Sequence, residues 1–362
     1  MKILFLVTGL GMGGAERQVC DLADQFADKG HEVFLISMTG ETVNRPQSVK
    51  VKVAVLNMTK TPLGFIKAYW QARCLINKFK PDVVHSHMVH ANLFARFLRI
   101  STHIRKLICT AHSSNEGGSG RMLAYRITDR LCDLNTNVSQ EAVDISVKRG
   151  AVPTAARIIA MPNGIDTARF TFNPSSRANL RERLHVDDNT PLMLAVGRFT
   201  VAKDYPNLLT AFSQLPSELS HTQLVIIGTG EEQTNIEALT AQLGVTERVH
   251  FLGLQHNVHE WMSLADVYVM SSAWEGMPLV LLEAMACERV VVATDCGGVK
   301  EVLGACGILV PAKNSTALSQ GLRQGLVLSQ VAAESQGKLA RERVVNNYSL
   351  SAQAERWLTL YQ

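Results

Sequence analysis

Short apolar runs alternate with longer segments whose apolar residues recur every three or four positions along most of the chain. The short runs are apolar enough to be buried on both faces, as strands of parallel sheets are. The longer segments have the spacing of amphipathic helices, so the alternation predicts an α/β fold with parallel sheets. In the first half we expect strands at 2–8, 32–38, 51–56, 83–86, 107–110 and 134–138, and helices at 15–29, 63–79, 91–99, 122–132 and 140–149. In the second half we expect strands at 192–196, 223–227, 249–252, 267–270, 290–294 and 308–310, and helices at 205–215, 231–243, 258–265, 278–287, 315–327 and 331–346.

The alternation breaks at the turn Pro162-Asn163-Gly164, which is followed by a polar segment with one short helix expected at 175–184. A chain of 362 residues also fits two domains better than one. The predicted organisation is a first domain at 1–170, a linker at 171–190, and a second domain at 191–346 with a last helix within 347–362 crossing back to the first domain.

The segment from Trp274 to Ala286 carries two glutamates around a predicted helix start. Glu275 falls in the loop after a buried strand, Pro278 suits the first helical turn, and Glu283 lies about one and a half turns into the helix. A helix N-terminus has free N–H groups and a positive dipole end, which favour an anion. Two hydrogen-bond acceptors beside an anion site suit a ligand with phosphates and hydroxyls, as a nucleotide sugar has.

A second loop, 197–203, follows the first predicted strand of the second domain and carries Arg198 and Lys203. These two cations can converge on a diphosphate, the guanidinium as a fork and the ammonium as a point charge. Lone surface cations are common, so the argument depends on position. Ligands of open parallel sheets bind at the carboxyl ends of the strands, where this loop and the Glu275 loop both lie.

The glycine turn after the first strand has glycines at positions 9, 11 and 14. This spacing raises a dinucleotide-binding domain as an alternative, but that site needs an acidic residue at the end of the second strand. Glu41 is the only late candidate there. Two other interpretations are a merely tight turn and a close approach of the backbone to a phosphate or sugar.

Composition is that of a soluble globular protein, with 46% hydrophobic and 19% charged residues. No apolar run approaches the length of about 20 residues that a membrane-spanning helix needs, and the run at 3–7 is too short for a signal peptide. The seven cysteines are scattered without metal-binding spacing, which predicts buried thiols and a cytoplasmic location. No nucleic acid partner is expected.

Charge is distributed unevenly along the chain. Residues 1–170 carry 22 basic and 13 acidic residues, a net charge of +9, and residues 171–362 carry 14 and 19, a net charge of −5. The predicted helix at 63–79 mixes aromatic residues with Lys67, Arg73 and Lys78. Peripheral attachment to the anionic inner face of a membrane is one interpretation. An ordinary amphipathic helix packed on the sheet with solvated cations is the other.

Three histidines, His85, His87 and His90, lie at the end of a predicted strand. On a strand, His85 and His87 share one face, as a pair of metal ligands would, but no clear third and fourth ligand accompanies them. We expect them to line a cleft for an acceptor or to be packed polar residues.

A series of motifs follows in a fixed order: Gly13-Gly14-Ala15-Glu16-Arg17, Val84-His85-Ser86-His87, Thr110-Ala111-His112-Ser113, Pro162-Asn163-Gly164-Ile165-Asp166, Val196-Gly197-Arg198 with Lys203, Gly228-Thr229-Gly230, and Glu275-Gly276-Met277-Pro278 with Glu283. No single motif is decisive. The set resembles retaining glycosyltransferases of the GT-B fold, in the large family 4 that acts on nucleotide sugars, and it covers nearly the whole chain. The resemblance implies two Rossmann-like domains facing across a cleft.

The resemblance also implies residue roles. Arg198 and Lys203 would bind the donor diphosphate and stabilise the leaving group, and Glu275 would meet hydroxyls of the donor sugar. Glu283 would accept hydrogen bonds from the ribose, and His112 would lie beside the reacting sugar. The remaining donor-binding residues would be Gly13, Gly14, Asn163, Gly253, Leu254, Gly276, Met277, Pro278 and Leu279.

The implied chemistry needs no cofactor and no metal, because cations and a helix N-terminus would neutralise the departing nucleoside diphosphate. Retention would follow from attack of the acceptor on the face that the leaving group vacates, with the leaving phosphate taking the proton. Glu275 as a nucleophile, by analogy with paired-carboxylate glycosidases, is an alternative.

The expected activity is transfer of a hexose or N-acetylhexosamine from a UDP-sugar to a glycan, which the resemblance places on a polyprenyl diphosphate carrier in bacterial surface-polysaccharide synthesis. One alternative is transfer to a small soluble acceptor. Another is a protein that binds a nucleotide sugar or NAD without transferring a sugar. Donor specificity would depend on the pocket around Met277 and Leu279, and acceptor specificity on loops such as 115–120.

Overall fold

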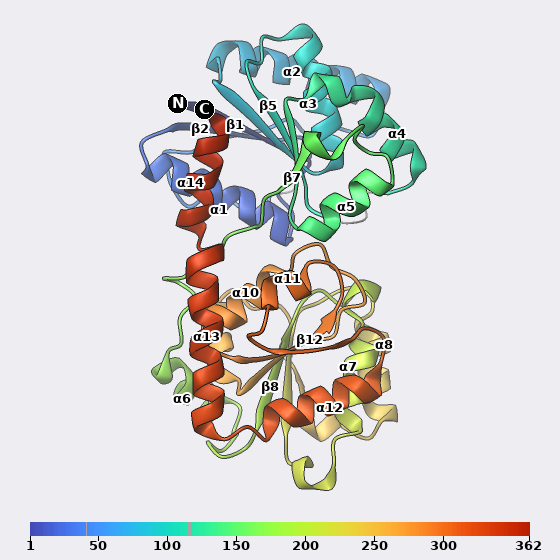
Figure 1. The fold of residues 1–362 in the computed structure, drawn as a ribbon, viewed down its shortest axis with the longest axis vertical. Helices are drawn as coiled ribbons and strands as arrows, with labels where there is room; N and C mark the ends of the chain where they lie inside the picture. The colour runs from blue at the N-terminus through green and yellow to red at the C-terminus, as the bar shows by residue number, and fades with distance from the viewer. Residues whose placement is uncertain (41, 114–116) are drawn as a thin grey trace. The chain divides into compact units, whose positions relative to one another are not determined.

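The computed structural model describes residues 1–40, 42–113 and 117–362. The described chain divides into two compact units, the first formed by residues 1–164 with 350–362 and the second by residues 165–349. Figure 1 traces their elements along the chain. Over these described residues the first unit contains a seven-stranded sheet and the second a six-stranded sheet. All strand pairs are parallel, so the predicted α/β fold with two parallel sheets is confirmed.

The sheet of the first unit has the strand order β3-β2-β1-β4-β5-β6-β7. The sequence analysis missed β7, because three residues are too few to form a recognisable apolar run. The strands are β1 (Lys2–Val7), β2 (Glu32–Ser37), β3 (Lys52–Val55), β4 (Val83–His87), β5 (Leu107–Ala111), β6 (Leu134–Asn137) and β7 (Ile158–Ala160).

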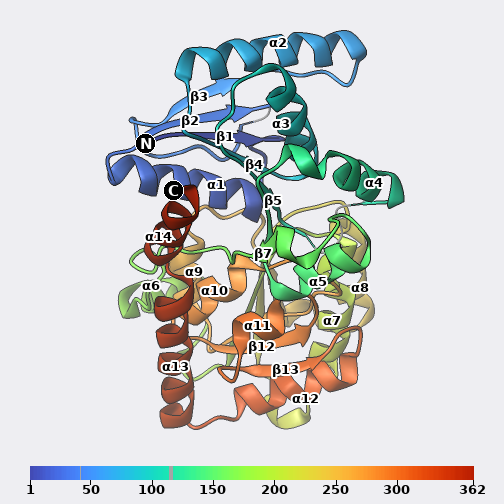
Figure 2. The ribbon, with the colours of Figure 1, turned by 45° about the horizontal axis from the view of Figure 1, so that its top comes forward.

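Helices cover both faces of this sheet, because successive side chains of a strand point to opposite faces. On β1, Phe5 packs with α1 and α14, whereas Leu4 and Leu6 pack with α2 and α3. Figure 2 shows α1 and α2 on opposite sides of the sheet. The helices are α1 (Gly14–Asp28), α2 (Pro62–Phe79), α3 (Val89–Ser101), α4 (Ser119–Thr128), α5 (Gln140–Lys148) and α14 (Leu350–Tyr361).

The last helix, α14, belongs to the first unit although residues 165–349 precede it. It packs against α1, where Lys29 Nζ donates to Glu355 Oε1 over 2.5 Å. The helices expected at 331–346 and within 347–362 correspond to α13 and α14, which are divided at Ser349.

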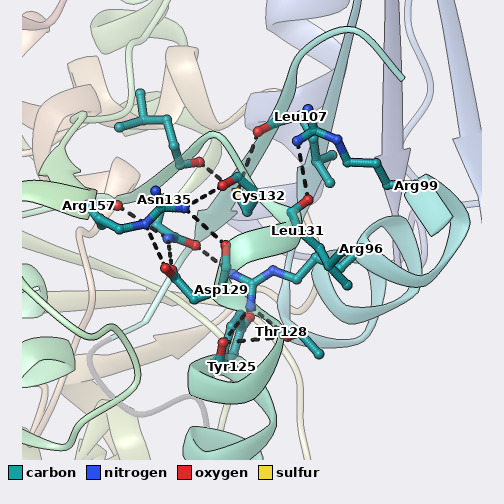
Figure 3. A network of polar contacts seen from close by, with 11 residues as sticks. Arg96, Arg99, Leu107, Tyr125, Thr128, Asp129, Leu131, Cys132, Asn135 and Arg157 are labelled. Atoms are coloured by element: carbon teal, nitrogen blue, oxygen red, sulfur yellow. Dashed lines mark hydrogen bonds and ion pairs between the residues drawn. The ribbon is translucent and has the colours of Figure 1, made fainter. Parts of the chain in front are cut away.

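A buried polar network ties α3 to the far edge of the first sheet (Figure 3). Arg96 is fully buried and donates to Asn135 Oδ1 over 2.6 Å and to the Tyr125 carbonyl over 2.8 Å. Asn135 Nδ2 in turn donates to Asp129 Oδ1 over 2.8 Å, and Arg157 Nε lies 2.6 Å from Asp129 Oδ2. Each buried charge therefore has an oppositely charged or hydrogen-bonding partner, as a low-dielectric interior requires.

The sheet of the second unit has the strand order β10-β9-β8-β11-β12-β13. Most of its elements begin and end within two residues of the predicted bounds, and the five-residue α11 was missed. The strands are β8 (Leu192–Val196), β9 (Gln223–Ile227), β10 (Val249–Phe251), β11 (Val267–Met270), β12 (Val290–Asp295) and β13 (Ile308–Pro311). The helices are α6 (Pro174–Arg183), α7 (Tyr205–Ser213), α8 (Gln233–Gln242), α9 (Val258–Leu264), α10 (Leu279–Ala286), α11 (Val299–Leu303), α12 (Ser315–Leu326) and α13 (Gln330–Tyr348).

Helix α6 falls within the segment that was predicted to be a linker, yet it is an integral part of the second unit. It packs against α9, and Arg177 and Arg181 both form ion pairs with Asp266, over 2.5 and 2.9 Å. Asp266 precedes β11 and also accepts a hydrogen bond from the Leu192 N–H at the start of β8. The same ion-pair cluster therefore fastens the segment 174–183 to the two central strands. The predicted boundaries at 170, 190 and 346 stay a prediction.

All seven cysteines are free thiols. Cys20, Cys109, Cys132 and Cys287 are buried as predicted, whereas Cys74 is exposed on α2. The prediction of buried thiols is therefore correct for these four cysteines, wrong for Cys74, and only partly met at Cys296 and Cys306, which are half-buried.

Candidate active site

The candidate site of the second unit lies where its strand order reverses. The chain passes from β8 to β9 and β10 on one side, and then returns to place β11 on the other side of β8. The loops that leave the carboxyl ends of β8 and β11 therefore diverge from neighbouring strands, which is where open α/β sheets bind ligands.

Lys203 and Glu275 meet at this point. Lys203 Nζ lies 2.6 Å from Glu275 Oε1, and only 21% and 15% of their side-chain surfaces are exposed. The Ser272 hydroxyl donates to the same carboxylate oxygen over 2.7 Å. A short, charge-assisted hydrogen bond in a partly desolvated place orients both side chains. The sequence analysis placed both residues in one site. It did not reveal that they pair, or that Ser272 donates a hydrogen bond to Glu275.

Hydrogen bonds to the backbone fix the two loops to each other. The Ala273 N–H donates to the Ala202 carbonyl over 2.8 Å, and the Ser271 hydroxyl donates to the Lys203 carbonyl over 2.8 Å. The ion pair is thus built on rigid backbone rather than on two free side chains.

Two buried tyrosines lie behind the pair. Burial, with a smaller contribution from the Glu275 charge, raises the pKa of Tyr205, whose hydroxyl donates to the Gly197 carbonyl over 3.0 Å. Burial raises the pKa of Tyr268 well above its ordinary value, and the charges of Tyr205, Glu283 and Glu275 raise it further by smaller amounts. The site therefore has an apolar, low-dielectric base, in which charges act more strongly than in water.

Arg198 projects from a loop that two glycines support. A Cβ on Gly230 would lie 2.7 Å from the Phe199 nitrogen, and one on Gly228 would collide with the Gly197 carbonyl. Only glycine lets the turn after β9 approach the loop after β8 this closely, which explains the Gly228-Thr229-Gly230 motif. Arg198 itself is exposed, and the described residues offer its guanidinium neither a hydrogen bond nor an ion pair.

Helix α10 begins at Leu279, so Pro278 is the residue before the first turn rather than part of it as predicted. Gly276 is exposed in part, whereas Met277, Pro278 and Leu279 are buried. Glu283 is only 3% exposed and lies inside the helix, as expected. The Gly276 carbonyl accepts from the Gly298 N–H over 3.0 Å, which joins the start of this segment to the loop after β12.

Gly253 and Leu254 follow β10 at the edge of the same sheet. The Gly253 carbonyl accepts from the Gly228 N–H over 2.9 Å, and Gly253 has a positive φ of 62°. Leu254 is 43% exposed. Their loop therefore rests on the Gly228 turn, which in turn rests on the loop of Arg198.

In the first unit, Gly13 and Gly14 lie where α1 begins, and the strand order of this sheet reverses between β1 and β4. The Glu16 carboxylate lies against Gly13, and a Cβ on Gly9 would lie 2.6 Å from Thr39 Oγ1. The glycine at position 9 thus serves a close approach of two loops. Glu41, on which the dinucleotide alternative depends, lies outside the described residues, as do positions 115 and 116.

His112 directly follows β5, and Asn163 lies in the segment after β7. Nε2 of His112 lies 3.0 Å from Nδ1 of His87, and burial lowers the pKa of His112 to about 4. The ring is therefore neutral at neutral pH. Asn163 is 7% exposed, and the N–H of Gly164 beside it donates to Gln18 of α1 over 3.0 Å.

The predicted residues therefore form two groups. Gly13, Gly14, His112 and Asn163 belong to the first unit. The second unit contains Arg198, Lys203, Gly253, Leu254, Glu275, Gly276, Met277, Pro278, Leu279 and Glu283.

His85 is a packed polar residue. Its Nδ1 lies 2.6 Å from the Tyr361 hydroxyl, and its Nε2 lies 2.6 Å from Thr110 Oγ1. The side chain of His85 is fully buried. His90 is exposed. In the part of the chain that the structure describes, no group of three or more His, Cys, Asp or Glu residues is arranged to hold a metal ion.

Comparisons with known proteins agree with this architecture. A family model described as Glycosyltransferase Family 4 matches residues 12–169, and one described as Glycosyl transferases group 1 matches residues 176–343. Two parallel α/β units, each with a reversal of strand order, are the architecture of the GT-B enzymes. The chain belongs to the GT-B glycosyltransferases, with the sequence features of family 4.

Similar proteins cover almost the whole chain. LpsE of Rhizobium meliloti, a lipopolysaccharide core biosynthesis glycosyltransferase, is 25% identical over 351 residues, which is 96% of this chain and 95% of LpsE. An N-acetyl-alpha-D-glucosaminyl L-malate synthase of Bacillus anthracis is 28% identical over 372 residues, 98% of this chain and 94% of that protein. The structure of Anabaena HepE in complex with UDP has a TM-score of 0.87 at 21% identity and covers 99% of both chains. Its complex with UDP-glucose has a TM-score of 0.82 at 21% identity and covers 99% of this chain and 100% of HepE.

We predict that Gly297→Ala lowers glycosyl transfer by about a hundredfold, because a displacement of about 1 Å in a catalytic loop has an effect of that size. A Cβ on Gly297 would collide with the Glu275 carbonyl, so the loop of the ion pair must move. Gly244→Ala is the matched control, since Gly244 has a similar positive φ of 67° and nothing within 4 Å of an added Cβ. Steady-state rates measure the effect. Equal activity in the two variants would show that the Glu275 loop tolerates displacement.

Proposed function

We propose that this glycosyltransferase moves a hexose or N-acetylhexosamine from a UDP-sugar, with retention, to a glycan acceptor carried on a polyprenyl diphosphate. The synthesis of a bacterial surface polysaccharide is the process proposed. The observation that carries the proposal is the Lys203–Glu275 pair at the reversal of strand order, with the exposed Arg198 on the same loop as Lys203. The name of LpsE and the complexes of HepE with UDP and UDP-glucose support the choice of donor and process.

In this proposal the donor diphosphate binds over the loop 197–203. Lys203 and Arg198 face its negative charge, which grows as the bond to the sugar breaks, and fixed cations stabilise that charge without reorganisation. Glu275 accepts hydrogen bonds from sugar hydroxyls and also keeps Lys203 in place. The N–H groups at the start of α10 add to the positive field around the leaving group.

The nucleoside would extend away from this centre. Glu283 accepts hydrogen bonds from the ribose hydroxyls, and the base rests near Gly253 and Leu254. The proposal also assigns donor binding to Gly13, Gly14, Asn163 and His112 of the first unit, with His112 beside the reacting sugar. No metal is needed in this scheme, because the protein itself supplies the cations.

Retention is proposed to follow from attack on the face that the leaving group vacates. The bond from the anomeric carbon to the phosphate oxygen breaks, the bond to the acceptor oxygen forms, and the acceptor proton passes to the departing phosphate. Glu275 as a covalent nucleophile is less favoured, because its Oε1 already accepts from Lys203 and Ser272. Both hydrogen bonds lower the nucleophilicity of the carboxylate.

We predict that Lys203→Ala lowers the transfer rate by about 10²- to 10³-fold, the loss expected for one preorganised charge-stabilising group. Lys338→Ala, on the exposed surface of α13, is the control that removes an equal charge and should keep wild-type activity. The double variant Lys203→Met with Glu275→Gln removes the unpaired carboxylate and should remain inactive. Turnover near wild type in Lys203→Ala would refute the assigned role.

The activity itself is tested by release of UDP from a panel of UDP-hexoses and UDP-N-acetylhexosamines, with and without a polyprenyl-diphosphate-linked glycan. We expect fast release only with the lipid-linked acceptor present. Release that a small soluble alcohol or acid stimulates equally would favour the soluble-acceptor alternative. Binding of UDP without any release, or binding of NAD instead, would indicate a protein without transferase activity on these donors.

A lipid-linked acceptor requires access to a membrane surface, and α2 supplies a suitable face. Leu63, Ile66 and Trp70 are 80%, 52% and 54% exposed, and they follow the spacing of one helical stripe. The opposite stripe, which includes Ala68 and Ala72, is buried against the sheet. The interpretation of α2 as an ordinary amphipathic helix packed on the sheet therefore explains its buried stripe only. The stripe of Leu63, Ile66 and Trp70 is a second apolar face, and no other part of the described structure covers it.

Cations flank this second face. Lys67 and Lys78 are exposed on α2, and the Arg73 guanidinium lies 4.9 Å from the centre of the Trp70 ring. Apolar side chains flanked by cations suit the boundary between acyl chains and anionic headgroups. None of the helices in the described chain has both the length and the apolarity to cross a membrane, so the proposed attachment is peripheral.

We predict that the protein sediments with phosphatidylglycerol vesicles at low salt and much less with phosphatidylcholine vesicles. Binding should fall at high salt, because screening weakens the contribution of each cation. Ile66→Asp should abolish sedimentation, whereas Leu339→Asp, at a 56% exposed position on α13, should not change it. Failure of the wild-type protein to bind anionic vesicles at low salt would exclude this surface as a membrane contact.

A further inference from the structure

His87 and His112 form a histidine pair at the carboxyl edge of the first sheet. His87 is the last residue of β4, and His112 follows the last residue of the neighbouring β5. The rings are tilted by 33°, with their centroids 5.2 Å apart, and Nδ1 of His87 lies 3.0 Å from Nε2 of His112. This distance is that of a hydrogen bond between two neutral imidazoles.

The surroundings hold His87 firmly. Its side chain is 1% exposed, and its ring centroid lies 5.5 Å from that of Phe5 and 4.0 Å from that of His85. His85 cannot serve as a second partner, because both of its ring nitrogens are already engaged by Tyr361 and Thr110. Packing on both sides therefore fixes the orientation of the His87 ring.

Each ring of the pair has one further nitrogen. Nε2 of His87 and Nδ1 of His112 are buried atoms, and neither has a hydrogen-bond partner among the described residues. A neutral imidazole carries a single proton, so one of its nitrogens donates and the other accepts. The direction of the hydrogen bond between the rings therefore decides which of the two outer nitrogens carries an N–H.

Two arrangements are possible. If His112 donated to His87, the second proton would lie on Nε2 of His87, an N–H without an acceptor in the more deeply buried ring. If His87 donates to His112, the outer N–H lies instead on Nδ1 of His112, whose residue is only partly buried. Both outer nitrogens are buried, but Nδ1 of His112 belongs to the ring nearer the surface, where a bound ligand can accept from it, so the second arrangement leaves the less costly unsatisfied N–H and is favoured.

We propose that His87 is a positioning residue: it donates from Nδ1 to Nε2 of His112 and thereby fixes His112 as a donor through Nδ1. The inference rests on the proposed function, which places His112 beside the donor sugar. His112 then presents an N–H to an oxygen of that sugar. A sugar that lacks the oxygen, or that carries an ammonium group there, loses this contact.

The proposal also restricts the chemistry of His112. A nitrogen that already carries a proton cannot take one from the acceptor, so His112 does not act as the base through Nδ1. This agrees with the proposed transfer of the acceptor proton to the departing phosphate. The contribution of His112 is then to orient the sugar.

The first test compares His87→Asn with His87→Gln. The Asn amide nitrogen occupies about the place of Nδ1 and can still donate to His112, whereas the Gln amide reaches the place of Nε2 and cannot. We expect kcat/KM for the donor within about threefold of wild type in His87→Asn, and at least about tenfold lower in His87→Gln. A purely structural role predicts the reverse order, because Gln fills the buried volume better than Asn.

Thermal unfolding of both variants separates these effects. We expect His87→Asn to be the less stable and the more active of the two. Activity that follows stability, with His87→Gln equal to or better than His87→Asn, would overturn the proposal.

The second test reads the tautomer directly and needs no transfer activity. In protein labelled with ¹⁵N-histidine, long-range ¹H–¹⁵N spectra distinguish an Nδ1–H ring from the Nε2–H ring that free imidazole side chains prefer, and His112→Asn assigns the signal. We expect His112 as Nδ1–H in the wild type and in His87→Asn, and as Nε2–H in His87→Gln. An Nε2–H ring in the wild type refutes the proposal. Absence of UDP release from every donor would instead refute the proposed function and leave the tautomer result to be judged separately.

Discussion

A parallel sheet has to be covered on both faces, because its helical crossovers lie on either side and its strands are mostly buried and apolar. Both units obey this constraint, and it determines where their chemistry can lie. All strands of a sheet end at the same edge, so residues far apart in sequence become neighbours there. Lys203 and Glu275, which are 72 positions apart in the sequence, meet in this way because β11 returns to the side of β8.

Close backbone contacts then convert these loop ends into fixed geometry. The turn at Gly228 and Gly230 supports the loop of Arg198, and Gly297 supports the carbonyl of Glu275. A side chain at any of these glycines would push a charged loop away from its position. Preorganised charge is the main means by which an enzyme stabilises a departing anion, so in the proposed mechanism these small residues would serve the chemistry without touching a substrate.

The sequence determined much of this arrangement. The strands at 192–196, 223–227 and 267–270 were predicted at their observed bounds, because continuous apolar runs of five or so residues have few other uses. The three-residue β7 and the five-residue α11 were missed, since neither is long enough to show a period. The roles of Arg198, Glu283 and the other site residues were carried by motif resemblance and stay predictions.

Partnerships between side chains were harder to foresee. The pairing of Lys203 with Glu275, and of His87 with His112, depends on which strands are neighbours in the sheet. The local periodicity of the sequence does not reveal strand order. Ser272 was overlooked for the same reason: a serine after a strand is common, and only the position of Glu275 gives its hydroxyl a purpose. The exposed stripe of α2 was likewise visible only once its buried stripe was known.

The position of α14 has a consequence for biosynthesis. Trp357 and Tyr361 complete the core around Phe26, and the Tyr361 hydroxyl is hydrogen-bonded to His85, so the first unit cannot close until these residues have left the ribosome. The ribosome must first translate all of residues 165–349, which form the second unit. During that interval, the face of the nascent first unit that α14 later covers exposes apolar side chains. Of the two units, the one whose first strands are synthesised earlier is therefore the last to finish folding.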